Sequence, residues 1–388
     1  MANNSSIEWT EATWNPIVGC SILSPGCIHC YAMDEAARQI RCAKGLNRFT
    51  HYADTVEYHK GKPVWTGKLA MAPDSILLAP LKRKKPTTYF VNSMGDLFHE
   101  DCPDEWIDRV FAVMALAPQH TFQVLTKRAG RLRKFFERLQ SCRPREDLVA
   151  CEMARLQGKP DLDRPSFNFP LPNVWLGVST ERQQEANERI PLLLQTPAAV
   201  RFISAEPLLG PIDLHPTWLN CKFCRGRGYV LPTFGANHFV ACEECIKWAR
   251  AGGTTILPGQ QATPGPRLDW VIAGGESGPN ARPMHPDWVR SLRDQCKAAD
   301  VAFFFKQWGE YLPWTQFGES GIEDGEPTRF RTMQWDGERW SDEGFPSWID
   351  SEDGSIDDYQ CVGRVGKKAA GRLLDGVLHD AMPERRSI

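Results

Sequence analysis

The sequence predicts an α/β protein: a full or partial parallel β/α (TIM-like) barrel with an inserted four-cysteine zinc knuckle and an irregular C-terminal extension. Two observations predict the barrel. Six strand-length apolar runs alternate with amphipathic helical stretches, and polar or charged residues stand where the runs end. A third observation, two closely spaced cysteine pairs within a long interruption of this alternation, predicts the knuckle.

The apolar runs have the length and the aromatic and β-branched content of strands. They are Thr88–Asp96, Thr121–Lys127, Val174–Thr180, Val200–Glu206, Leu268–Glu276 and Val301–Gln307. The helical stretches between them are Asp104–Ala117, Arg128–Gln140, Glu181–Gln195 and Pro286–Ala298. Such alternation predicts a parallel sheet with right-handed crossovers.

Polar side chains gather where these strands stop. In a β/α barrel the carboxyl ends of the strands converge on one mouth, where active sites are built. We therefore expect Lys127, Glu206 and Glu276 to be catalytic residues at that mouth, with Ser179 beside them. An open doubly wound sheet, which gathers ligands only near a switch point, is the alternative.

The alternation divides the chain into four parts. Residues 1–209 form the first part of the barrel and 268–310 its remainder. Residues 210–267 form the inserted knuckle segment, and 311–388 form an extension that is Trp-rich, then acidic, then basic.

Composition excludes several classes of protein. The chain has 388 residues, of which 42% are hydrophobic and 24% charged, as in folded globular proteins. Its net charge of -2 excludes a global attraction to nucleic acid, so any such contact must be local. No apolar run is long enough for a membrane span, and the segment Met1–Trp9 lacks the features of a signal peptide. We expect a cytoplasmic protein without membrane contact; no pattern indicates an oligomeric state.

Three cysteines, Cys20, Cys27 and Cys30, lie on one loop that leads into a helix starting near Cys30. Three thiolates can hold an iron–sulfur cluster and leave one iron without a protein ligand. The N-terminus of the helix would face that anionic cluster. A zinc site completed by His29 is the main alternative, although His29 stands awkwardly between two of the cysteines. Chance proximity of the three is the remaining one.

This loop and its position resemble the radical S-adenosylmethionine superfamily, over roughly residues 7–310. The resemblance implies a [4Fe-4S] cluster on Cys20, Cys27 and Cys30, and S-adenosylmethionine on the open iron. It also implies that His29 or Tyr31 lies near the adenine. Six residues separate Cys20 from Cys27, a longer gap than the superfamily usually shows.

The superfamily also places a Gly-Gly-Glu-like element after the second strand, where it meets the methionine amino group. Met94-Gly95-Asp96 occupies that position, so the resemblance implies cofactor contacts there, with Asp96 supplying the carboxylate. Ser179 is a further cofactor-side candidate. The literal Gly274-Gly275-Glu276 comes too late in the chain, and we assign Glu276 to the mouth and the substrate.

More narrowly, several strings resemble a phage- and bacteria-borne branch of that superfamily whose function is unassigned. They include Ser-Pro-Gly-Cys-Ile-His-Cys-Tyr-Ala, Ser-Met-Gly-Asp-Leu-Phe, Leu-Thr-Lys-Arg, Ser-Ala-Glu-Pro-Leu-Leu-Gly and Gly-Lys-Lys-Ala-Ala-Gly-Arg-Leu-Leu-Asp-Gly. This resemblance implies a reaction type more than a substrate.

The second cysteine cluster has the spacing of a zinc site. Two pairs, Cys221 with Cys224 and Cys242 with Cys245, are 17 residues apart and would bind Zn²⁺ tetrahedrally. The knuckle could be a structural staple or, with its basic and aromatic neighbours, a nucleic-acid contact. A second iron–sulfur cluster at these cysteines is the third alternative.

The leading hypothesis is a radical S-adenosylmethionine enzyme, reduced by an external flavodoxin- or ferredoxin-like donor. It would cleave S-adenosylmethionine reductively to a 5′-deoxyadenosyl radical. A nucleic-acid base, in DNA or RNA, is the expected substrate for modification or repair; a peptide or a small metabolite is the alternative. A different class of function is a non-catalytic zinc and cysteine scaffold that binds nucleic acid or a partner protein.

Overall fold

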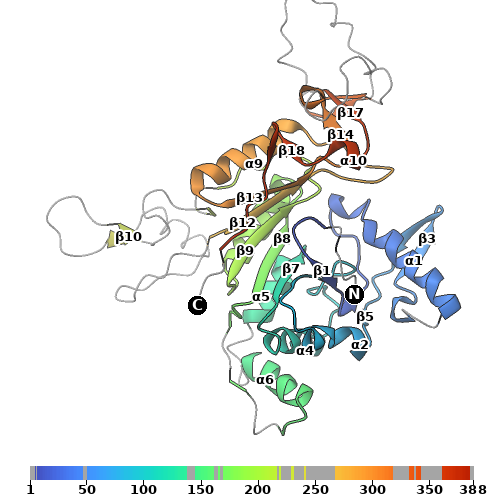
Figure 1. Ribbon diagram of the computed structural model, residues 1–388, viewed down its shortest axis with the longest axis vertical. Coiled ribbons are helices and arrows are strands. Elements are labelled where there is room, and N and C mark those ends of the chain that lie inside the picture. Colours follow the sequence, from blue (N-terminus) through green and yellow to red (C-terminus); the bar gives the residue numbers. More distant parts are fainter. Residues whose placement is uncertain are drawn as a thin grey trace, which may run out of the picture.

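The computed structural model describes residues 5, 7–46, 50–137, 145–160, 165–166, 169–215, 218–219, 229–230, 240–241, 267–317, 332–335, 338–341 and 361–384. At its centre is a parallel sheet of seven strands, ordered β1-β6-β7-β8-β9-β12-β13 (Figure 1). These strands are β1 (Ala12–Trp14), β6 (Thr88–Val91), β7 (Thr121–Thr126), β8 (Val174–Ser179), β9 (Val200–Ala205), β12 (Trp270–Gly274) and β13 (Ala302–Gln307).

The spatial order of the strands is their order in the chain. A doubly wound sheet reverses its strand order at a switch point, and this sheet has no reversal. The sheet curls into a half-barrel, and no pairing joins β1 to β13 among these described strands. The predicted β/α barrel is therefore confirmed in its partial form, and the six predicted strands are confirmed with it.

The predicted helices are confirmed, with small shifts at their ends. They are α4 (Asp104–Ala115), α5 (Ala129–Glu137), α7 (Gln183–Leu194) and α9 (Pro286–Ala299). A further helix, α6 (Arg145–Leu156), lies between α5 and β8 in the chain. Helix α9 shows why they form where they do: Pro286 lies in its first turn, and the His285 side chain accepts a hydrogen bond from Asp287 N. The helix ends at Asp300, whose backbone is left-handed (φ 54°).

Side chains alternate between the two faces of the sheet. Those on the convex face, such as Val124 and Ile203, join the main core with the helices. Those on the concave face form an aromatic cluster that includes Trp9, Trp175, Phe202, Trp270 and Phe304. Phe202 fits because Gly177 faces it on β8, where a Cβ atom would lie 2.5 Å from the ring. The aromatic cluster fills the concave side below the carboxyl strand ends, which carry polar residues instead.

One long helix and several short elements surround the start of the barrel. They are α1 (Tyr31–Leu46), α2 (Asp74–Leu77), α3 (Ala79–Lys82), the pair β2 (Ile17–Val18) with β5 (Ala70–Met71), and the hairpin β3 (Val56–His59) with β4 (Lys62–Trp65). The helix expected near Cys30 is α1. The hairpin turns at Lys60 and Gly61, both with positive φ.

The described part of the C-terminal extension is regular, which differs from the prediction. It forms an antiparallel sheet ordered β14 (Tyr311–Pro313), β17 (Cys361–Arg364), β15 (Thr332–Trp335) and β16 (Trp340–Ser341). Helix α10 (Lys367–Ala370) and the hairpin β18 (Leu373–Leu374) with β19 (Val377–Leu378) follow. Strands this short show no periodicity, and β17 lies far along the chain from its partners β14 and β15.

The end of the extension returns to the last strand of the barrel. Phe304 on β13 forms an antiparallel bridge with Asp380, and Phe305 N donates to His379 O at 2.9 Å. The indole of Trp270 donates to Ala381 O at 2.8 Å. The outer edge of β13 is thus covered by this segment.

In the inserted segment the structure describes one antiparallel pair, β10 (Tyr229–Val230) with β11 (Val240–Ala241). The four knuckle cysteines, Cys221, Cys224, Cys242 and Cys245, lie outside the described residues. Within the described residues, no helix has the length and apolar character needed to span a membrane.

Candidate functional site

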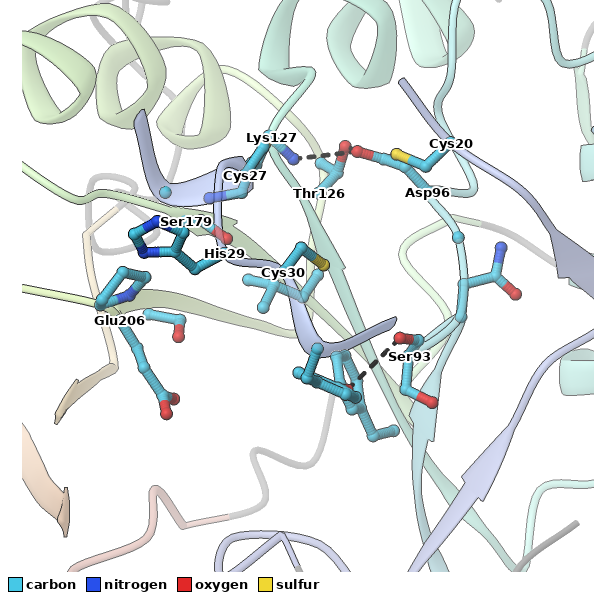
Figure 2. Close-up of a pocket in the computed structure, with 18 of the residues that line it drawn as sticks. Cys20, Cys27, His29, Cys30, Ser93, Asp96, Thr126, Lys127, Ser179 and Glu206 are labelled. Carbon is cyan, nitrogen blue, oxygen red and sulfur yellow. Dashed lines mark hydrogen bonds between the residues drawn. The ribbon is translucent and has the colours of Figure 1, made fainter. Parts of the chain in front are cut away.

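A cavity of about 240 Å³ opens at the carboxyl ends of the barrel strands (Figure 2). This cavity is lined by nearly all of the site residues that the sequence predicts and the structure describes. They are Cys20, Cys27, His29, Cys30, Tyr31, Gly95, Asp96, Lys127, Ser179, Glu206 and Glu276. Residues up to some 250 positions apart meet here because parallel strands bring their carboxyl ends to one edge.

Met94 is the exception. Its side chain is buried in a separate apolar cluster with Val18, Ala32 and Met33, beneath the start of α1. Its backbone still connects the segment of Cys20 with the segment of Asp96, because Gly19 N donates to Met94 O at 3.0 Å.

Two glycines allow this close approach of β1 and β6 beyond their ends. Gly19 and Gly95 form a parallel bridge, and a Cβ atom on Gly95 would lie 2.9 Å from Gly19 O. Gly19 has a φ of +93°, and a Cβ atom there would meet Lys68 O. A glycine is therefore required at position 95 because the backbone next to Cys20 passes too close for a side chain.

The three cysteines of the loop are free thiols around one cavity. Cys27 lies at the end of the short 3-10 turn Pro25–Cys27, and α1 begins directly after Cys30. Burial raises the pKa of the Cys20 thiol to about 12; Asp96, Cys30 and Cys27 add to this rise, and Arg128 opposes it. The three thiols are thus close enough to influence one another electrostatically.

Among the described residues, no three His, Cys, Asp or Glu side chains form a group that could hold a single metal ion. Thiol ligands of an iron–sulfur cluster bind different irons, so they surround a volume rather than meet at one point. The three free thiols around a cavity match that donor set.

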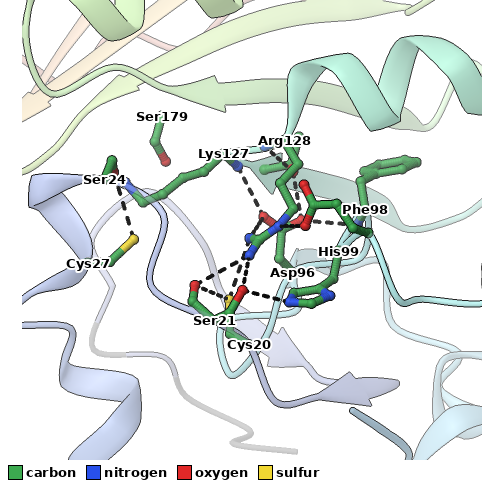
Figure 3. A network of polar contacts seen from close by, with 12 residues as sticks. Cys20, Ser21, Ser24, Cys27, Asp96, Phe98, His99, Lys127, Arg128 and Ser179 are labelled. Atoms are coloured by element: carbon green, nitrogen blue, oxygen red, sulfur yellow. Dashed lines mark hydrogen bonds and ion pairs between the residues drawn. The ribbon is translucent and has the colours of Figure 1, made fainter. Parts of the chain in front are cut away.

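Arg128 anchors the loop beside Cys20 (Figure 3). Its side chain is only 2% exposed, and one nitrogen lies 3.6 Å from the Cys20 sulfur. The guanidinium donates to Ser21 Oγ at 2.7 Å, to Asp96 Oδ2 at 3.0 Å and to Glu100 Oε2 at 2.6 Å. A buried cation is therefore held against the first residues of the gap between Cys20 and Cys27.

The Asp96 carboxylate is fully engaged with its own chain. Besides Arg128, it accepts from Thr126 Oγ1 at 2.6 Å, Phe98 N at 3.0 Å and Lys127 N at 3.1 Å. Four donors fill the acceptor sites of one carboxylate. In this structure Asp96 lines the cavity and holds Arg128 in place.

Glu181 anchors the middle of the loop. It is fully buried and accepts from Ser24 Oγ at 2.6 Å, from Arg189 at 3.0 Å and from Lys127. Burial acts to raise the pKa of Glu181, but the two cations and the Ser24 hydroxyl outweigh it and lower that pKa. Gly26 packs directly on this carboxylate, because a Cβ atom there would lie 2.4 Å from Glu181 Oε1.

Glu276 anchors the far end of the loop. It accepts from the Arg282 side chain at 2.6 and 2.8 Å and lies 3.3 Å from His29 Nδ1. Arg282 also donates to Pro25 O at 3.0 Å. Burial acts to raise the pKa of Glu276, but the hydrogen bonds from Arg282 outweigh it and lower that pKa. The preceding position, Gly275, requires a glycine because a Cβ atom there would collide with Trp308 O.

Glu206 follows β9, next to the end of β12, and pairs with Lys306 at the end of β13. The two side chains keep 17% and 14% of their surface exposed. Ser179 and Ser204 line the cavity near them. Tyr31, which is largely exposed, donates to Ser93 O at 3.3 Å.

The sequence reasoning did not identify Arg128, Glu181 and Arg282 as site residues. The sequence predicts helices that begin at Arg128 and Glu181, where charged side chains usually face solvent. The helices begin later, at Ala129 and Gln183, so both residues remain in the loops after β7 and β8 and point into the site. Their adjacency to Lys127 and Thr180 at strand ends is the signal that could have identified them.

A family model described as "Protein of unknown function (DUF5131)" matches residues 4–383. No curated protein and no solved structure matches the chain.

Proposed function

The chain belongs to the family described as Protein of unknown function (DUF5131), and from its site we propose that it is a radical S-adenosylmethionine enzyme. Cys20, Cys27 and Cys30 would hold a [4Fe-4S] cluster. One observation carries the proposal: three free thiols surround a single cavity at the carboxyl mouth of a parallel partial barrel.

The chemistry of the donor set fits such a cluster. Three thiolates and the cluster core carry net negative charge, which nearby cations stabilise in a protein interior. Arg128 faces the Cys20 sulfur, and Lys127 acts electrostatically on the Cys30 thiol. When bound, the cluster and S-adenosylmethionine would supply a 5′-deoxyadenosyl radical through reductive cleavage of the cofactor.

The residues of this chain would position the cofactor and exclude water. His29 or Tyr31 would lie near the adenine, and Gly95, which lines the cavity, would lie near the methionine part. The aromatic cluster below the cavity excludes water from the concave side of the sheet. Lys306 would face the substrate, and Glu206 would face either the substrate or the methionine amino group.

The methionine amino group has two candidate partners. The resemblance implies Asp96, whose acceptor sites are filled by its own chain in this structure. Glu206 has Lys306 as its partner and retains exposed surface. Calorimetric titration of Asp96→Asn and Glu206→Gln with S-adenosylmethionine separates the two, because only the variant at the contacting carboxylate should lose affinity.

We further propose that the substrate is a nucleic-acid base and that the electron comes from a flavodoxin- or ferredoxin-like protein. The basic and aromatic residues around the knuckle cysteines support the first point. Free cysteines suit a reducing compartment such as the cytoplasm.

Anaerobic purification and reconstitution with iron and sulfide test the proposal. We expect a brown protein that releases 5′-deoxyadenosine from S-adenosylmethionine once reduced, measured with DNA, RNA and nucleosides as candidate substrates. The matched control is the chain with all three loop cysteines changed to Ala. A colourless protein that contains only zinc would instead support the scaffold function.

A further inference from the structure

A second hollow lies beside the mouth of the cavity. It is a groove of about 590 Å³ between the C-terminal antiparallel sheet and the loop that joins β12 to α9. We call it the Trp–Arg groove and define it by residues that line it: Arg282, Met333, Trp335, Arg339, Trp340 and Arg364.

The aromatic wall of the groove is packed from behind. Trp335 meets Trp288 of α9 with ring centroids 5.2 Å apart, and meets Trp340 at 5.4 Å. Trp288 itself is 7% exposed, whereas Trp335 and Trp340 are half-buried. The two outer indoles are therefore held in place and keep accessible surface toward the groove.

The other wall is basic. Four arginines line the groove, Arg182 in addition to the three named above, against one carboxylate, Glu338. Arg364 donates to Gly278 O and Pro279 O, which fixes its orientation, and Arg339 is exposed. Three of the four arginines also have carboxylate partners outside the groove, Glu185, Glu276 and Glu310, so this wall offers guanidinium groups in fixed positions.

The groove and the cavity share a wall. Pro25 and Arg282 line the groove, while their neighbours in space and sequence, Gly26 and Glu276, line the cavity. Arg282 links the two sides, because it donates both to Glu276 and to Pro25 O. A polymer bound in the groove would therefore pass next to the cavity mouth.

We propose that the Trp–Arg groove binds single-stranded nucleic acid. Aromatic faces that stack bases, next to arginines that pair with phosphates, are the chemistry by which such strands are held. Trp335 and Trp340 would take bases, and Arg339 and Arg364 would take phosphates. The groove would thereby present a neighbouring base to the cavity; this last role rests on the proposed function, whereas strand binding does not.

Fluorescence anisotropy with the full-length chain tests the proposal. The probes are labelled single strands of DNA and of RNA, about 12 nucleotides long, and a DNA duplex of the same sequence, at several salt concentrations. We expect a single strand to bind more tightly than the duplex, because paired bases cannot stack on the indoles. The DNA and RNA arms show which strand the groove prefers.

Two groove variants and one matched control locate the site. Trp340→Leu should weaken binding roughly fivefold or more, and Arg339→Glu should also lower the salt dependence by about one released ion. Arg155→Glu, on α6 and 74% exposed, is the control and should bind as the unaltered chain does. Circular dichroism confirms that each variant is folded.

Three results would overturn the proposal: no strand binding at physiological salt, equal binding of duplex and single strand, or groove variants that bind like Arg155→Glu. The third would place the binding elsewhere, for example at the knuckle segment. The proposed function is judged separately, because 5′-deoxyadenosine release without strand binding refutes the groove alone. Strand binding without any cluster refutes the radical chemistry alone.

Discussion

The guanidinium of Arg128 lies 3.6 Å from the sulfur of Cys20. This contact ties the loop after β7 to the loop after β1, and it belongs to a set of three anchors. Arg128 contacts Ser21, Glu181 contacts Ser24, and Arg282 contacts the carbonyl of Pro25. The long gap between Cys20 and Cys27 is therefore held by side chains from three strand ends, and the following predictions test what those anchors do.

We predict that Cys20→Ala, Cys27→Ala and Cys30→Ala each abolish the iron–sulfur absorption after anaerobic reconstitution. Zinc should stay near about one per chain, because the knuckle cysteines belong to a separate segment. Cys42→Ala, an exposed cysteine on α1, is the control and should retain its iron. Unchanged iron in all three loop variants would end the radical interpretation.

We predict that Asp96→Asn lowers the free energy of unfolding by about 2–3 kcal/mol. The amide cannot accept all four hydrogen bonds, and the buried Arg128 loses one of its two carboxylate partners and keeps only Glu100. Loss of that anchor should also speed the release of iron to a chelator. Glu206→Gln, at the partly exposed pair with Lys306, should change stability far less. Urea unfolding measures the stability of each variant, and calorimetric titration with S-adenosylmethionine measures its affinity for the cofactor. If Asp96→Asn loses cofactor affinity but keeps its stability, Asp96 contacts the amino group as the resemblance implies.

We predict that stability decreases in acid as Glu181 is protonated. A carboxyl whose pKa is lowered on folding contributes stability that is fully present above its ordinary pKa of 4.5. That contribution is lost as the pH falls through the folded-state value. Urea denaturation between about pH 5 and pH 3 should therefore show a steep decline in the free energy of unfolding.

Glu181→Gln should be less stable at neutral pH by about 3 kcal/mol, and its stability should decline less steeply in acid. Glu188→Gln, at an exposed carboxylate of α7, is the control; an equal decline in both variants would contradict the assignment.

We predict that a Gly-Ser replacement of Asn220–Ile246 leaves cleavage of S-adenosylmethionine largely intact but impairs action on the substrate. The segment follows Glu206 and contributes none of the loop cysteines, so it can contact a substrate near the mouth. The measurement compares uncoupled 5′-deoxyadenosine with product formed by the same folded protein. If both decrease in proportion to the folded fraction, the knuckle is a structural staple.

The strands and most of the cavity were predictable because each signal is local. Polar residues directly after apolar runs mark the carboxyl ends of strands, and parallel strands then bring Lys127, Ser179 and Glu206 together. Glu181 was not predictable in the same way. Its role depends on Ser24, which lies 157 positions away in the chain, and on a helix that starts two residues later than its sequence suggests.

The C-terminal sheet was missed for a related reason. β14 pairs with β17 across a separation of about fifty residues, and both strands are only three or four residues long. Neither has enough residues to show an alternation that could be read from sequence. The Trp-rich composition of the extension was visible, but not that Trp335 would pack against Trp288 of α9.

The covered edge of β13 has a consequence for the synthesis of the chain. The strand is complete at residue 307, but the backbone that covers its edge begins with His379. At ribosomal speeds this delay lasts roughly 4 to 14 seconds. Throughout it, β13 is paired with β12 on one side only, so the newly made barrel presents the unpaired outer edge of a strand containing Phe303, Phe304 and Phe305. Slow translation of residues 308–378 would therefore appear as aggregation of nascent chains, although the last described strand of the barrel ends at residue 307.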